Sequence, residues 1–136
     1  MRNVVLWIGM SVDGFTSGPN ERLDWLVPHA TTPEAEAIHR RLRERCDTVL
    51  VGRVNYEGFF GYWPKVKDDI QNSTRLTQSL LAAGLVDELY LTVVPVIVGE
   101  GRALFSNLPR QIDLRSEDLT RFDDGTLAIR YRVIKT

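Results

Sequence analysis

The residues best suited to bind an anion follow a short apolar run at residues 48–51, in which three of the four side chains are β-branched. This composition is typical of a strand buried on both faces. Gly52 and Arg53 come directly after it, and Asn55 stands where a helix would begin. Backbone N–H groups at a helix start favour negative charge, and a guanidinium can donate to two phosphate oxygens. The segment therefore predicts a phosphate site; the alternative is a tight turn with a solvated arginine.

A second candidate group is the carboxylate of Asp13, which lies in the turn sequence Ser-Val-Asp-Gly directly after the apolar segment 3–10. A carboxylate beyond the end of a strand can lie at the mouth of a ligand pocket. The same residue can instead form an Asx-type turn that bonds to its own backbone. Trp25, in a loop expected at 16–28, has two interpretations as well: a wall beside a flat heteroaromatic ligand, or a plug in the core.

Composition predicts one ordinary globular domain, because the chain has 136 residues, of which 43% are hydrophobic and 26% charged. The net charge of -1 provides no long-range field that would favour nucleic acid or an anionic membrane. No apolar run approaches the length of a membrane span, and no signal-peptide pattern precedes the first strand. We therefore expect a cytoplasmic protein.

Other catalytic constellations are not indicated. Cys46 is the single cysteine, which excludes an internal disulfide and a cysteine-based zinc site; we expect it to end a helix as a buried thiol. His29 and His39 are ten residues apart, one in an expected loop and one on an expected helix. This arrangement indicates neither a pair of metal ligands nor a catalytic triad, and no metal is predicted.

The remaining pattern predicts an α/β fold. A first helix begins at Thr32-Pro33 and buries a stripe at helical spacing, and a second helix at 74–83 ends at Gly84. The final segment alternates apolar and polar residues, as expected for an antiparallel hairpin. We therefore predict a mixed, mostly parallel sheet flanked by helices, with an antiparallel C-terminal hairpin. The expected strands are 3–10, 48–51, 88–98 with a kink at Pro95, 111–117 and 126–134, and the expected stripe is Ala35, Ile38, Leu42 and Cys46.

Four motifs, in the same order along the chain, raise a family resemblance. They lie at residues 11–14 (SVDG), 52–57 (GRVNYE), 84–88 (GLVDE) and 99–105 (GEGRALF). The set resembles the dihydrofolate reductase superfamily, in particular its branch related to the C-terminal reductase domain of the bifunctional deaminase-reductase of bacterial riboflavin biosynthesis. Each motif is weak alone, but the ordered set is fairly specific.

The resemblance implies a single dihydrofolate-reductase-like domain over residues 1–136. Such a domain binds NADPH and passes its hydride to a pterin, a pyrimidine intermediate or a related flat heterocycle. By this analogy Asp13 is the catalytic residue, and Ser11 and Trp25 lie near the substrate. The cofactor-binding residues would stand at two helix starts: Gly52, Arg53 and Asn55 at the first, and Asn72, Ser73 and Thr74 at the second.

The chain departs from the family between those two helix starts. Relatives separate them by several dozen residues, whereas here we expect a central segment between about 64 and 71 to be missing relative to the family. Either the printed sequence omits that segment, or the protein has lost part of its nucleotide-binding half. Asn72 also replaces a glycine of the family, and its side chain narrows the approach of a pyrophosphate. Discrimination between NADPH and NADH, and catalysis itself, therefore stay open.

Two functions follow as hypotheses. The first is an NADPH-dependent reductase acting on a small heterocycle. The alternative is a non-catalytic nucleotide-binding or assembly module that keeps the fold. In either case we expect a homodimer, because residues 89–98 and the final strand are more apolar than one small domain needs, and because the resemblance points to dimers.

A substitution of Arg53 tests the predicted phosphate contact. Arg53→Ala is expected to weaken NADPH binding by about 1.5–3 kcal/mol, the range for a hydrogen bond to a charged group. The free energy of unfolding should change much less, because an exposed turn arginine contributes little to stability. Isothermal calorimetry and urea unfolding measure the two quantities. Unchanged affinity would leave only the turn interpretation.

Overall fold

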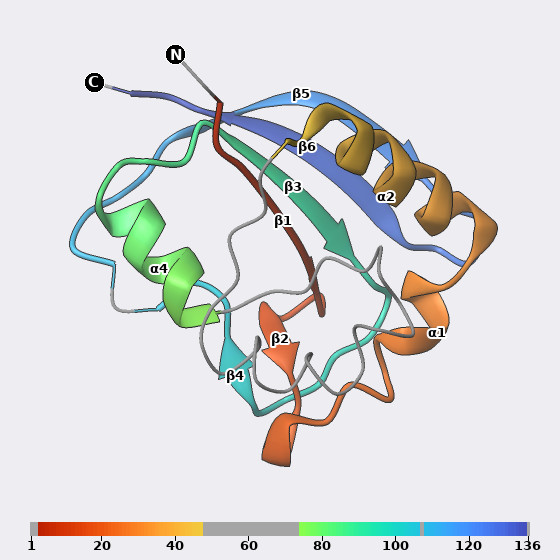
Figure 1. Ribbon diagram of the computed structural model, residues 1–136. Helices are drawn as coiled ribbons and strands as arrows, with labels where there is room; N and C mark the ends of the chain where they lie inside the picture. Colours follow the sequence, from red (N-terminus) through yellow and green to blue (C-terminus); the bar gives the residue numbers. More distant parts are fainter. Residues whose placement is uncertain (1–2, 48–73, 107, 136) are drawn as a thin grey trace.

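The computed structural model describes residues 3–47, 74–106 and 108–135. Their centre is a four-stranded mixed sheet (Figure 1), which confirms the predicted fold class. β1 and β3 are parallel, whereas β3 and β6, and β5 and β6, are antiparallel. The strand expected at 48–51 lies outside the described residues. The strands, in spatial order, are β1 (Val5–Met10), β3 (Glu88–Val93), β6 (Leu127–Val133) and β5 (Leu114–Arg121).

The alternation predicted for the last strand sets which residues face each layer. Leu127, Ile129, Tyr131 and Val133 are at every second position of β6 and so share one face, with Arg130 and Arg132 on the other. Register extends these faces across the sheet, because directly paired residues point to the same side. The hairpin between β5 and β6 is therefore confirmed, with its turn at the predicted Asp-Asp-Gly sequence.

α2 (Pro33–Arg45) covers one face of the sheet and begins as predicted. The Thr32 hydroxyl accepts a hydrogen bond from the Ala35 backbone N–H at 3.2 Å, which caps the helix. Its buried stripe packs against sheet residues of the same layer. This layer consists of Ala35, Ile38 and Leu42 from the helix with Tyr90, Phe122, Ala128, Val5 and Trp7.

The prediction of a buried thiol at Cys46 is wrong. α2 ends at Arg45, and Cys46 has extended backbone angles that carry its side chain away from the helix stripe into solvent. His39, which the sequence did not place in the core, is one of the buried residues of α2. Its ring centroid lies 4.0 Å from that of Trp7. Burial, helped by the charge of Arg43, lowers the pKa of His39 to about 4, so the ring is neutral at pH 7.

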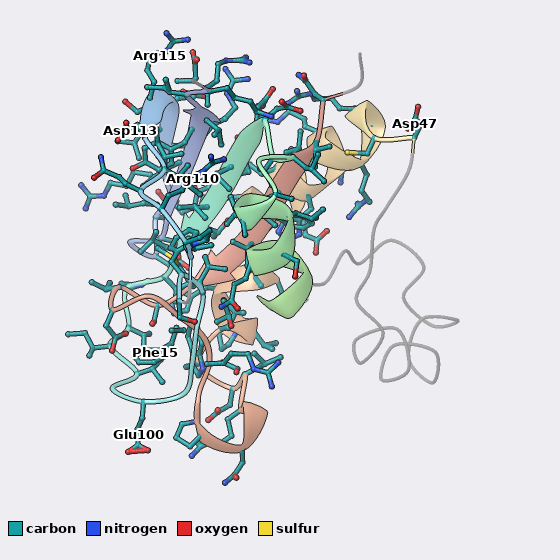
Figure 2. The ribbon with its side chains drawn as sticks, turned by 90° about the vertical axis from the view of Figure 1, so that its left-hand side faces the viewer. Phe15, Asp47, Glu100, Arg110, Asp113 and Arg115 are labelled. Carbon is teal, nitrogen blue, oxygen red and sulfur yellow. The ribbon has the colours of Figure 1, made fainter. Side chains whose placement is uncertain are left out.

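α4 (Thr74–Ala82) lies on the opposite face of the sheet from α2, in front of β1 and β3 in Figure 2. Gly84 has a φ of 70°, the left-handed conformation that ends a helix, as predicted. The helix contributes Leu81 to the second core cluster. The other buried members of that cluster are Ile8, Val86, Leu89, Leu91 and Leu104.

Two predicted strands have different bounds in the structure. The strand expected at 88–98 ends at Val93, because the chain turns away before Pro95, which has no N–H to continue the ladder. The strand expected at 111–117 is β5, which starts later and runs to Arg121. β5 is exposed and polar along most of its length, so its sequence carries only a weak periodic signal.

The segment expected as a loop at 16–28 contains short elements. β2 (Phe15–Ser17) pairs with β4 (Arg102–Ala103) in a small antiparallel sheet, and η1 (Pro19–Glu21) and α1 (Val27–Ala30) follow it. In the described ranges, no helix has the length and apolar character that crossing a membrane requires.

The buried neutral His39 should make stability depend on pH. Its pKa is about 4 in the folded chain and 6.5 in the unfolded chain, so between these values only the unfolded chain binds the proton. The free energy of unfolding therefore falls as pH drops through this window, by about 1–2 kcal/mol between pH 7 and 5. In the His39→Phe variant, the free energy of unfolding measured with urea should no longer fall by this amount between pH 7 and 5.

His29→Gln is the matched control, since it removes the other histidine. It should keep the His39 contribution. An identical loss between pH 7 and 5 in wild type and His39→Phe would contradict the assignment.

Candidate functional site

The candidate site lies where β1 and β3 end. Ligands of open α/β sheets bind beyond the carboxyl ends of parallel strands, and β1 and β3 are the parallel pair of the described sheet. Two segments leave these ends: residues 11–18 after β1 and residues 94–104 after β3. Figure 2 shows Phe15 and Glu100, one from each segment, at the same lower end of the molecule.

Asp13 joins the two segments. Its Oδ1 accepts a hydrogen bond from the Val98 backbone N–H at 3.1 Å, and its Oδ2 accepts one from Gly99 N–H at 2.8 Å. The Ser11 hydroxyl donates to Oδ1 at 2.6 Å. This last hydrogen bond lowers the pKa of Asp13 most, and the two backbone donors lower it further against the effect of desolvation. The carboxylate is therefore ionised at neutral pH and serves as an acceptor.

Ser11 is fully buried, and its hydroxyl is committed to this arrangement. Besides donating to Asp13, its Oγ accepts from the Phe15 backbone N–H at 3.0 Å. The Asp13 carboxylate thus accepts from backbone 85 and 86 positions away, and its position at a pocket mouth stays a prediction. The Asp13 side chain shapes the backbone of both segments at the carboxyl edge of the parallel strands.

Backbone contacts continue the pairing of the two segments. Val12 N–H donates to Val96 O at 2.9 Å, and Leu104 N–H donates to Gly14 O at 2.9 Å. Gly101 makes the closest approach, because a Cβ at this position would lie 2.0 Å from the carbonyl oxygen of Ser17. Only glycine fits between the two segments at this point. This explains why the predicted turn at 99–101 has a glycine at position 101.

An open cleft of about 510 Å³ lies beside this crossing. It is lined by Ser17, Gly18, Pro19, Asn20, Glu100, Gly101 and Arg102. Trp25 lies next to it rather than in its lining: its indole N–H donates to the Arg22 carbonyl at 3.0 Å and lies near Gly18. Trp25 therefore supports the loop that forms one wall of the cleft.

A pair that the sequence did not indicate lies at the same end of the sheet. His29 Nδ1 is 2.7 Å from Asp124 Oδ2, although the two residues are 95 positions apart. The backbone N–H of the buried Thr126 donates to Asp124 Oδ1 at 2.9 Å. Burial acts to raise the pKa of Asp124, but the hydrogen bonds from Thr126 and His29 outweigh it and lower the pKa. The pair ties α1 to the hairpin between β5 and β6.

The residues predicted to bind cofactor phosphates are mostly beyond the described part of the chain. Gly52, Arg53, Asn55, Asn72 and Ser73 lie outside the described residues, and their roles stay predictions. Thr74 is the first residue of α4, as expected for the second helix start. The first turn of α4 contains no acidic residue, and this end of the helix points toward the carboxyl ends of β1 and β3 (Figure 1). Such an end favours an anion.

Comparison with known proteins places the chain in a family. The family model for the RibD C-terminal domain matches residues 2–75 and 70–128. The chain belongs to the RibD C-terminal domain family. Uncharacterized protein YyaP of Bacillus subtilis is 22% identical over 182 aligned positions, which include 96% of this chain and 94% of that protein. The dihydrofolate-reductase-like fold expected from the resemblance is therefore confirmed.

Two solved structures of RibD-like proteins have the same fold. A putative riboflavin biosynthesis protein from Shewanella sp. PV-4 has a TM-score of 0.67 at 18% identity, over 98% of this chain and all of that one. The riboflavin biosynthesis reductase Rib7 of Saccharomyces cerevisiae has a TM-score of 0.58 at 13% identity, over 98% of this chain and 89% of that one.

This chain is shorter than the relative to which it aligns. The alignment with YyaP has 182 positions, more than the 136 residues of this chain, so YyaP carries residues that have no counterpart here. The two stretches that match the family model meet at residues 70–75. This is close to the interval where the sequence predicts a missing segment, and the position of that segment stays a prediction.

The close approach at Gly101 can be tested by comparison with a second glycine. Gly101→Ala places a methyl group against backbone atoms of Ser17 and Gly18, which cannot rotate away, and should cost about 3 kcal/mol of unfolding free energy or more. Gly99→Ala is the control, because its φ is also positive (89°, against 145° at Gly101) but no atom lies within 4 Å of the added group. It should cost about 1 kcal/mol. Equal losses in urea unfolding would mean that the two segments do not cross as described.

Proposed function

We propose that this chain is an NADPH-dependent reductase that transfers a hydride to a small flat heterocycle of the pterin or pyrimidine class. Membership of the RibD C-terminal domain family carries the proposal. The name of Rib7 describes that protein as a riboflavin biosynthesis reductase, and the Shewanella protein is called a putative riboflavin biosynthesis protein. When bound, NADPH would supply the hydride, and the protein would supply binding and orientation.

The described residues fit a dinucleotide at the carboxyl edge of the sheet. The start of α4 offers backbone N–H groups, and its first turn contains no acidic residue that would compete with a phosphate. Thr74 would hold cofactor phosphate there together with Asn72 and Ser73. Gly52, Arg53 and Asn55 would hold phosphate at the other predicted helix start. This division of roles follows the resemblance stated from the sequence.

Asp13 has a positioning role in this proposal. Its low pKa makes it a poor proton donor at neutral pH, and its oxygens accept from Ser11, Val98 and Gly99. It would keep the backbone at 98–99 in place beside the reacting ring. The proton that accompanies the hydride from NADPH would come from solvent, because the Asp13 carboxylate is held ionised.

One observation favours a second candidate. This chain is shorter than the alignment that relates it to YyaP, so part of the family domain has no counterpart here. If that part is needed for turnover, the protein is a nucleotide-binding or assembly module that keeps the fold.

Cofactor binding and hydride transfer separate the two candidates. NADPH titrated to about 1 mM should quench the emission of Trp7, Trp25 and Trp63 or transfer energy to the nicotinamide, and calorimetry should give the same affinity. NADH is the matched comparison. Loss of NADPH absorbance with pterins, flavins and pyrimidine intermediates then tests turnover.

Each outcome of this experiment has a meaning. Binding with turnover of any of these heterocycles supports the reductase. Binding without turnover across all three classes supports the module. Absence of an optical and a calorimetric signal at saturating NADPH overturns both.

A further inference from the structure

The side chain of Gln78 joins α4 to the segment that follows β3. Its Nε2 donates to the carbonyl oxygens of Ala103 and Leu104, at 3.4 and 3.2 Å, and to the Ser106 hydroxyl at 3.0 Å. Because carbonyl oxygens only accept hydrogen bonds, the amide nitrogen of Gln78 has to face this segment. Gln78 therefore holds residues 103–106 at one place along α4.

The backbone that accepts from Gln78 is also held from its other side. The Leu104 backbone N–H donates to the carbonyl oxygen of Gly14 at 2.9 Å. Gly14 is next to Asp13, whose carboxylate accepts from the backbone at 98–99. A series of hydrogen bonds thus runs from α4 through Gln78 and Leu104 to the Asp13 turn.

Gln78 lies one turn after the beginning of α4. Thr74 is the first residue of the helix, and residues four positions apart lie on the same face of a helix. Figure 1 shows the beginning of α4 beside β2 and β4, which belong to the two segments that Asp13 joins. The hydrogen bonds of Gln78 therefore set how far the beginning of α4 lies from these segments.

Apolar packing alone would not fix this distance. Leu81 of α4 and Leu104 belong to the same buried cluster, which holds the helix against the sheet. Such contacts are non-directional, so they tolerate a small displacement of the helix along its axis. Hydrogen bonds have narrow limits on distance and angle, and Gln78 provides them between α4 and residues 103–106.

We propose that Gln78 is a positioning residue for the cofactor. It holds the beginning of α4, which would bind phosphate, at a fixed distance from the Asp13 turn, where the reacting ring would lie. This role rests on the proposed function. A ligand that spans both places gains affinity when the distance is fixed, because binding at one place presents the rest of the ligand to the other. A ligand that contacts only one place gains nothing from Gln78.

Isothermal calorimetry with two ligands tests this role. The first is NADPH, which spans both places, and the second is its adenosine bisphosphate half, which has phosphate but no nicotinamide. Gln78→Met keeps most of the side-chain volume and removes the N–H donors. NADPH should bind this variant about 10-fold more weakly than the wild-type protein. The affinity of the half cofactor, measured in competition with NADPH so that weak binding is detected, should change by less than about 2-fold.

Gln111→Met is the matched control. Gln111 is exposed, and its Nε2 donates to Asp113 Oδ1 at 2.6 Å, so the same substitution removes a hydrogen bond outside α4. Both ligands should bind this variant as they bind the wild-type protein.

Ser106→Ala is a second test that leaves α4 unchanged. It removes one of the three acceptors of Gln78 and should weaken NADPH binding by about 3-fold, without an effect on the half cofactor. It decides the matter if Gln78→Met does not fold.

Two results in the variants would overturn the role of Gln78. Wild-type affinity for NADPH in both Gln78→Met and Ser106→Ala would mean that the link does not position the cofactor. Equal weakening of NADPH and of the half cofactor would mean that Gln78 supports the beginning of α4 itself and not its distance from the Asp13 turn. A wild-type protein that binds neither ligand would overturn the proposed function and this role with it. That failure is distinct, because it is seen before any variant is measured.

Discussion

The carboxylate of Asp13 is the contact on which the rest of the site depends. Backbone hydrogen bonds also join the segments after β1 and β3, but Asp13 is the side chain that fixes residues 98–99 of the second segment against the first. With Oδ1 and Oδ2 each accepting a backbone N–H, the two segments have one arrangement, and Gly101 can then cross against Ser17. A fixed backbone at this edge is what a binding site for a flat ring requires.

The fold could be predicted from the sequence because its signals are local. Thr32-Pro33 gives α2 its cap, Gly84 gives α4 its end, and β6 alternates without a break. The predicted ends of these elements were wrong where contacts with distant parts of the chain decide the end. β3 stops at Val93 because the chain leaves the sheet, and Cys46 is exposed because α2 ends one residue earlier.

The site was predictable only in part, since its contacts join residues that are distant in sequence. Asp13 was identified from its turn, but its partners Val98 and Gly99 carry no signal because they donate through the backbone. The sequence indicates no partner for His29, and Asp124 lies in the Asp-Asp-Gly turn sequence. Their pairing exists only after the hairpin has folded against α1.

That pairing has a consequence for how the protein is made. His29 and Asp124 are 95 positions apart, and β1 pairs with a strand that begins at Glu88. During synthesis α2 can form early from local contacts. The apolar side chains of β1, in contrast, must wait for β3, and α1 must wait for nearly the whole chain to leave the ribosome. Such long-range closure slows folding and prolongs the exposure of apolar surface. The first strand therefore stays without its neighbour in the sheet until residues 88–93 have been synthesised.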